Sequence, residues 1–142
     1  MGRSYLALLA VLTLASSAPL LSQQAKIKKV PARHTSPASG KEMYTAYCAS
    51  CHGSHAKGDG PAAGALKTPP ADLTTLAQKN NGKFPSSHFA AILSGEEELT
   101  AHGSKDMPVW GPVFLRVSQG HASEVQQRIS NLSRYIESLQ GK

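Results

Sequence analysis

The chain has 142 residues, which allows one ordinary domain and excludes a second of similar size. Only 6% of its residues are aromatic, so it has little bulky apolar material for a core. The formal net charge of +6 does not indicate nucleic-acid binding, because the excess lies in the N-terminal tail; from Gly40 onward, ten basic residues accompany nine acidic ones.

Residues 1–24 are typical of an export signal. Arg3 precedes an apolar run from Leu6 to Leu14, and small residues suited to cleavage follow it. The run is shorter than the roughly 20 residues that a membrane span needs. We therefore predict a signal peptide that is removed after export. The alternative is an uncleaved signal that anchors the chain in the membrane.

Residues 25–39 mix Lys, Pro, Ala and Ser without periodicity, and they predict a flexible basic linker. Such a linker can lie against an anionic membrane surface or an acidic partner. The folded domain is then expected over residues 40–142.

The domain begins with a helical pattern. A helix is expected over residues 40–52 and should end at Gly53. One face of it is apolar: Met43, Tyr44, Tyr47 and Cys48.

Two shorter helices are expected next, after a loop rich in Gly and Pro. Asp72 can cap the first, which should end near residues 80–82. Ser86 or Ser87 can cap the second, which should end at Gly95.

An irregular segment is expected over residues 96–119, because these residues have no helical period and contain four residues that break helices: Gly103, Pro108, Gly111 and Pro112. The acidic run Glu96–Glu98 at its start is expected to be a solvated surface. Irregular segments of this length are uncommon in a compact domain unless they serve a site.

The last helix has the clearest pattern. Ser123 and Gln126 have the spacing of a capping box. One face is apolar: Val125, Ile129, Leu132, Ile136 and Leu139. No strand is predicted, so the fold class is all-α, with several short helices tied together by long loops.

Residues 48–52 read Cys-Ala-Ser-Cys-His, the pattern that attaches a c-type haem. Two thiols three positions apart can reach the two neighbouring vinyl groups of one porphyrin, and the next residue offers an imidazole to the iron. We therefore predict that Cys48 and Cys51 hold one haem c covalently and that His52 ligates its iron. A large apolar cofactor would also complete a core that the polypeptide fills poorly.

Three other chemistries use two cysteines: a plain disulfide, a thioredoxin-like dithiol and a zinc site. A disulfide leaves His52 and the thin core unexplained. A thioredoxin-like dithiol belongs in a βαβ unit, and no strand is predicted. Zinc needs further ligands, and the later histidines do not form pairs at the spacing of three to five residues that zinc fingers use: His55, His88, His102 and His121.

Met107 is the predicted sixth ligand of the iron. A thioether sulfur is a soft ligand that raises the potential of haem iron relative to a second imidazole. Met107 lies far downstream, in a loop stiffened by Pro108, where it can cover the second face of the haem. Met43 lies on the attachment helix itself and faces the wrong way. His102 and His121 are the alternative ligands.

From about residue 40 to residue 140, the chain resembles the class I c-type cytochromes, the bacterial monohaem family. Gly40, Tyr44 and the Cys-x-x-Cys-His motif are similar to the family's N-terminal helix, where glycine permits close crossing by the C-terminal helix. Leu132 and Tyr135 resemble the residues at that crossing.

Two further segments carry the resemblance. Residues 69–73 resemble the segment whose proline carbonyl accepts a hydrogen bond from the proximal imidazole; Pro70 is favoured for this role over Pro69. Residues 107–111 resemble the distal loop, with Met107 as the axial ligand. Trp110 in this loop would donate its indole N–H to a haem propionate or fill the core.

The resemblance implies a cytochrome c fold around one covalent haem, and single-electron transfer rather than enzymatic catalysis. We expect a monomeric carrier in a respiratory-type chain, in the periplasm or on the outer face of the cytoplasmic membrane, with donor and acceptor proteins as its partners. The alternative is a haem-bearing subunit of a larger dehydrogenase or oxidase complex. An enzyme or gas sensor with an open iron site would bind carbon monoxide rapidly, which a site closed by Met107 should resist.

Overall fold

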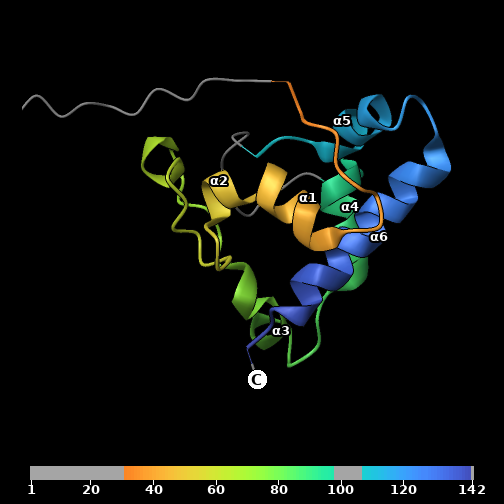
Figure 1. Ribbon diagram of the computed structural model, residues 1–142. Helices are drawn as coiled ribbons and strands as arrows, with labels where there is room; N and C mark the ends of the chain where they lie inside the picture. Colours follow the sequence, from red (N-terminus) through yellow and green to blue (C-terminus); the bar gives the residue numbers. More distant parts are fainter. Residues whose placement is uncertain (1–30, 98–106, 142) are drawn as a thin grey trace, which may run out of the picture.

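The computed structural model describes residues 31–97 and 107–141, and every regular element in that part of the chain is a helix (Figure 1). The elements are α1 (Gly40–Tyr47), α2 (Ala49–His52), η1 (Ala63–Ala65), η2 (Leu73–Thr75), α3 (Leu76–Lys79), α4 (Ser86–Ser94), α5 (Trp110–Val117) and α6 (Ala122–Ser138). The all-α class predicted from the sequence is confirmed. The expected signal peptide over residues 1–24 lies outside the described residues, as do Glu98 and His102.

The crossing of α1 and α6 organises the fold (Figure 1). A Cβ placed on Gly40 would lie 2.2 Å from the carbonyl oxygen of Asn131 and 2.7 Å from the Cβ of Tyr135, so only glycine allows this approach. One step along the same interface, the rings of Tyr44 and Tyr135 pack with their centroids 5.5 Å apart. The predicted contact between the first and last helices is therefore confirmed.

The core lies between α6 and the three helices α1, α4 and α5 that pack on it. Four residues of the predicted α6 face are buried, and Leu139 packs at the edge of the core: Val125, Ile129, Leu132 and Ile136. The other helices contribute a few large side chains, among them Met43, Phe89, Leu93 and Phe114. Met43 is fully buried, which agrees with its assignment to the core rather than to a ligand position.

The attachment segment differs in detail from the prediction. One continuous helix was expected over residues 40–52, but α1 ends at Tyr47 and α2 begins at Ala49. The break falls at Cys48, whose φ of −111° lies well away from the helical value. Gly53 ends α2 as predicted, and its φ of +80° is a conformation that glycine adopts at no steric cost.

Helix α5 occupies a stretch that was predicted to be irregular. Pro112 is its third residue, where the missing N–H has no partner within the helix in any case. A Cβ on Gly111 would lie 2.4 Å from the carbonyl oxygen of Ser94, so this glycine allows α5 to approach the end of α4. Both residues were interpreted as helix breakers because tertiary contacts are invisible in a sequence window.

Two predicted helix caps are wrong. Helix α4 begins after Pro85, with no side-chain cap from Ser86 or Ser87, although it ends at Gly95 as expected. Helix α6 begins after His121, and Ser123 makes no capping hydrogen bond. Asp72 does cap its short helix, because its carboxylate accepts a hydrogen bond from the N–H of Thr74 at 2.8 Å.

The basic linker is shorter than predicted, because residues 33–39 are docked on the domain; we call them the N-terminal strap. The side-chain amide of Asn131 on α6 donates to the carbonyl of Pro37 at 2.9 Å. Thr35, Pro37 and Ser39 are half-buried. The prediction of a flexible segment over residues 25–39 is therefore wrong for the strap.

Surface features complete the description. Glu96 and Glu97 are exposed, as expected for the acidic run, and Glu97 pairs with His88. Across residues 31–97 and 107–141, no helix combines the length and the hydrophobicity that crossing a membrane requires.

Candidate functional site

The short helix α2 brings both cysteines and His52 onto one turn. The carbonyl of Cys48 accepts hydrogen bonds from the N–H groups of Cys51 at 3.1 Å and of His52 at 2.9 Å. Both cysteines are half-buried free thiols that no disulfide joins. The plain disulfide considered from the sequence is therefore absent from the structure.

The loop after α2 folds back along it and holds its geometry. The N–H of Gly58 donates to the carbonyl of His52 at 2.9 Å, and the N–H of Gly60 donates to that of Cys51 at 3.0 Å. On the other side, the buried hydroxyl of Tyr44 donates to the carbonyl of Gly53 at 2.6 Å. These bonds connect the peptides around His52 to α1 and to the loop, so the orientation of this turn is set by several elements at once.

The imidazole of His52 has one nitrogen engaged by the protein. Its Nδ1 lies 3.0 Å from the carbonyl oxygen of Ala71. A carbonyl only accepts, so Nδ1 carries the hydrogen and Nε2 presents its lone pair. Burial lowers the pKa of His52, and the bond to Ala71 opposes that shift in part. The ring is thus held neutral, in the form that binds a metal, with its outer hydrogen bond to a backbone carbonyl.

The prediction that Pro70 supports this ring is wrong, because the acceptor is Ala71. The carbonyl of Pro70 instead approaches Gly58, where a Cβ would lie 2.3 Å from it. Gly58 has a φ of +82°, so glycine is needed there for two reasons. The doubled proline fixes the direction of the chain at this point, and only the packing of the 53–60 loop selects which carbonyl faces the imidazole.

The thiol of Cys48 lacks the character of a redox-active thiol. Burial raises the pKa of Cys48 to about 12, with a smaller effect from the neighbouring Cys51. Reactive dithiol centres have thiols with lowered pKa values instead. A zinc site also finds no support: within the described parts of the chain, no group of three or more His, Cys, Asp or Glu residues is placed to hold a metal ion.

The segment that follows this site, residues 61–83, contributes no buried side chain to the core. None of residues 61–83 is buried, although three leucines lie among them at intermediate exposure: Leu66, Leu73 and Leu76. Apolar side chains are normally covered in a folded domain. Leu73 and Leu76 pack on the edge of the main core, and Leu66 follows η1, the element of this stretch that contacts α2.

The predicted distal residues border the same core. Met107 is half-buried and, like Cys48, packs against the main apolar cluster. Trp110 is buried and stacks on Phe114, with centroids 5.7 Å apart. Its ring also lies 5.3 Å from that of Tyr47, the residue before Cys48. The structure thus brings Trp110 to the attachment helix, in agreement with the core-filling alternative for this residue.

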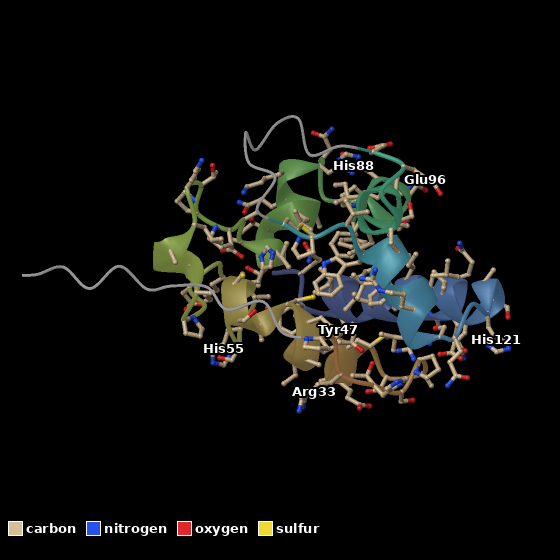
Figure 2. The ribbon with its side chains drawn as sticks, turned by 90° about the horizontal axis from the view of Figure 1, so that it is seen from above. Arg33, Tyr47, His55, His88, Glu96 and His121 are labelled. Atoms are coloured by element: carbon tan, nitrogen blue, oxygen red, sulfur yellow. The ribbon has the colours of Figure 1, made fainter. Side chains whose placement is uncertain are left out.

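His121 is poorly placed as an alternative ligand. Its Nδ1 lies 2.8 Å from the carbonyl oxygen of Ser118, in the turn before α6. Figure 2 shows His121 at the opposite end of the molecule from His55, which follows His52 by three residues.

Residues 35–118 match the family model for cytochrome c oxidase, cbb3-type, subunit III. The chain belongs to this family. No curated protein and no solved structure matches the chain significantly.

Membership makes the protein a class I c-type cytochrome domain, and its cofactor is covalently bound haem c with its iron. The residues present fit that group. The cytochrome offers two free thiols and a neutral imidazole with an unused nitrogen.

Sequence reasoning missed two residues of this site. Ala71 carries no signal of its own as a hydrogen-bond acceptor, because any residue has a carbonyl. Tyr47 was recognised as part of an apolar helix face, but its contact with Trp110 joins residues 63 positions apart and could not be predicted from local pattern.

Proposed function

We propose that this cytochrome carries single electrons through one haem c held by Cys48, Cys51 and His52, with Met107 as the second axial ligand. The observation that supports it most is the state of His52: Nδ1 is tied to Ala71 while Nε2 is left to bind iron. The two free thiols on the same turn supply the covalent attachment.

The haem, when bound, supplies an iron centre that changes its oxidation state by one electron. The protein's part is to hold that centre still and to keep water from it. His52 is oriented by Ala71, and the turn that carries it is fixed by Tyr44 and Gly58. A rigid set of ligands keeps the geometry similar in both oxidation states, so little reorganisation opposes the transfer.

Closure by Met107 makes the cytochrome a carrier rather than an enzyme. If His52 and Met107 both held the iron, the protein would leave no position open to oxygen or peroxide. The half-burial of Met107 against the core is consistent with a held side chain rather than a loose one. Rapid binding of carbon monoxide by the reduced protein would contradict this proposal.

We propose that the protein acts outside the cytoplasm, in the periplasm or on the outer face of the cytoplasmic membrane. The support is the sequence pattern of residues 1–24, which predicts an export signal, and haem c is the cofactor of the family. The folded domain then begins with the strap. A monomeric carrier that meets donor and acceptor proteins in a respiratory-type chain is the simplest reading of this arrangement.

The second candidate function is that of a haem-bearing subunit in an oxidase complex. The family description, which names subunit III of a cbb3-type oxidase, favours it. The two functions differ in association rather than in chemistry. A stoichiometric complex with a membrane oxidase after gentle detergent extraction would support the subunit, whereas recovery of the cytochrome alone would support the mobile carrier.

The deciding experiment is a mass and visible spectrum of the exported protein, made in a host that matures c-type cytochromes. We expect the mass of the polypeptide plus one haem, and a sulfur-to-iron charge-transfer band in the oxidised state. Met107→Ala should abolish the band. Met43→Leu is the matched control, because it replaces a fully buried methionine of the core and should leave the band in place. A colourless protein would refute haem attachment, and a band that survives Met107→Ala would refute the distal ligand.

A further inference from the structure

Tyr47 connects the two sides of the proposed haem site. It is the last residue of α1, directly before Cys48, and it is buried. Its ring lies 5.3 Å from that of Trp110 and 5.8 Å from that of Phe114, the two aromatic residues of α5. Trp110 begins α5 only three residues after Met107, a span of at most about 11 Å of extended chain. The position of this ring contact therefore constrains where Met107 can go.

The hydroxyl of Tyr47 is fastened to the N-terminal strap. It donates to the carbonyl of Arg33 at 2.5 Å, and the hydroxyl of Thr35 lies 2.8 Å from it. Figure 2 shows Tyr47 near the middle of the molecule, with Arg33 outside it. Since Tyr47 uses its hydrogen on Arg33, Thr35 is the donor in the second bond. The strap thus covers the polar end of a ring whose flat face packs on α5.

The strap is fastened in turn by the buried guanidinium of Arg128 on α6, which is 2% exposed. One of its nitrogens donates to the hydroxyl of Thr35 at 3.0 Å, and another donates to the carbonyl of the same residue at 2.9 Å. The charge of Arg128 is balanced by Glu124, at 2.7 Å, and Ser118 accepts a further bond at 3.0 Å. The described residues therefore form a continuous chain of hydrogen bonds from α6 through Thr35 to Tyr47.

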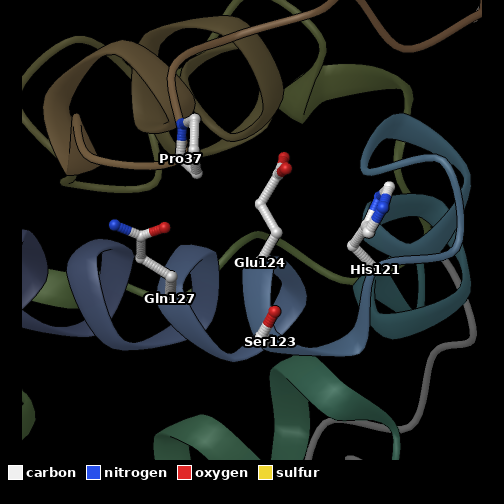
Figure 3. Close-up of a pocket in the computed structure, with 5 residues that line it drawn as sticks. All are labelled: Pro37, His121, Ser123, Glu124 and Gln127. Carbon is white, nitrogen blue, oxygen red and sulfur yellow. The ribbon is translucent and has the colours of Figure 1, made fainter.

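The strap is held at these points rather than packed along its whole length. Beside Thr35, Pro37 borders a surface pocket whose other lining residues come from the start of α6 (Figure 3): His121, Ser123, Glu124 and Gln127. Water can reach the strap on that side. The bonds at Thr35 and Tyr47 hold the strap together with the bond from Asn131 to Pro37 and the bonds of Ser36 and Ser39 with Glu42 on α1.

We propose that Tyr47 is a positioning residue that acts through its hydroxyl. The strap and Arg128 hold this hydroxyl, so the ring stays against Trp110 and keeps Met107, three residues earlier, in place as a ligand; we call this arrangement the latch. The inference rests on the proposed function, because it takes Met107 as the distal ligand. It goes beyond that function because it gives the N-terminal strap a part in holding the ligand Met107.

The test is competition for the iron by added imidazole in the oxidised, haem-loaded full chain. Tyr47→Phe removes the hydroxyl and keeps the ring. We expect the imidazole concentration that removes half of the charge-transfer band to fall about tenfold, which corresponds to about 1.4 kcal/mol. Thr35→Val should shift it in the same direction, and the double variant should shift it by less than the sum, because the two hydroxyls share one bond.

Two controls separate a latch from general stability. Tyr135→Phe makes the same chemical change on a ring whose hydroxyl has no hydrogen bond within the described residues, and it should match the wild type. Ile136→Val trims the buried core of α6 without touching the strap, so it lowers the unfolding midpoint but should leave the imidazole titration unchanged. A titration shift in Ile136→Val equal to that in Tyr47→Phe would overturn the latch.

The outcomes also distinguish this inference from the proposed function. A wild-type protein that binds haem but has no charge-transfer band overturns both the distal ligand and the latch that depends on it. A wild-type band with the same imidazole titration in Tyr47→Phe overturns the latch alone and leaves the carrier function standing.

Discussion

Gly40→Ala tests the helix crossing on which the fold is built. The added Cβ would lie 2.2 Å from the carbonyl oxygen of Asn131, whereas favourable non-bonded contacts are about 3.5 Å apart. The obstacle is backbone on a long helix, so it cannot rotate away as a side-chain tip could. Helix α1 must therefore shift by about 1 Å relative to α6, at the interface that also holds Tyr44 against Tyr135.

The expected loss of stability follows from two opposing effects. Overpacking of this kind costs about 3 kcal/mol, the upper part of the usual range, because backbone must move. Alanine recovers up to about 1 kcal/mol through its better helix propensity. The net loss of about 2 kcal/mol should lower the melting temperature of a domain of this size by roughly 10 °C.

The measurement is guanidinium denaturation of the haem-loaded protein, followed by far-ultraviolet circular dichroism. Gly64→Ala is the matched control, because a Cβ at that position meets no atom within 4 Å. It should change the free energy of unfolding by no more than about 0.5 kcal/mol. Should Gly40→Ala prove as stable as the wild type, the reasoning from the crossing distance fails.

Two further changes probe the caps and the buried charge. Asp72→Ala removes the cap of η2 and should lower the free energy of unfolding by about 1 kcal/mol at pH 7. Because the bonds from Thr74 lower the pKa of this carboxyl, the difference from the wild type should shrink in acid-unfolding curves as the pH falls below about 4. A difference that does not depend on pH would contradict the role of the charge. Arg128→Met should cost about 3 kcal/mol in denaturant unfolding, the lower end for a broken buried ion pair, because Glu124 still reaches water. The exposed Arg134→Met should be nearly neutral, and an equal loss in both would show that the strap is not anchored by Arg128.

Local pattern was sufficient where one face of a helix meets the core. The apolar period of the last helix correctly predicted the burial of Val125, Ile129 and Leu132, because the side chains that repeat every third or fourth residue must share a face. It failed at α5, where Gly111 and Pro112 read as breakers. Glycine there admits the end of α4, and proline falls in the first turn, where no helical hydrogen bond is lost.

In the candidate site, too, the local features were predictable from the sequence and the long-range contacts were not. The Cys-x-x-Cys-His spacing is local, so the residues that could attach a haem were recognisable from sequence. Their supporting contacts are not local. Which carbonyl faces His52 depends on how the 53–60 loop folds back on α2, and the structure selects Ala71 rather than the expected Pro70.

The sequence by itself determined the all-α class, the cofactor motif and the helix face that builds the core, because each depends on residues that are near one another along the chain. Only the tertiary structure decided that residues 33–39 belong to the domain. Their composition is typical of a solvated linker, and no pattern within these residues predicts that they pack on the domain. Arg128, 93 residues away from Thr35, helps to hold the strap, because its guanidinium donates hydrogen bonds to the hydroxyl and to the carbonyl of Thr35.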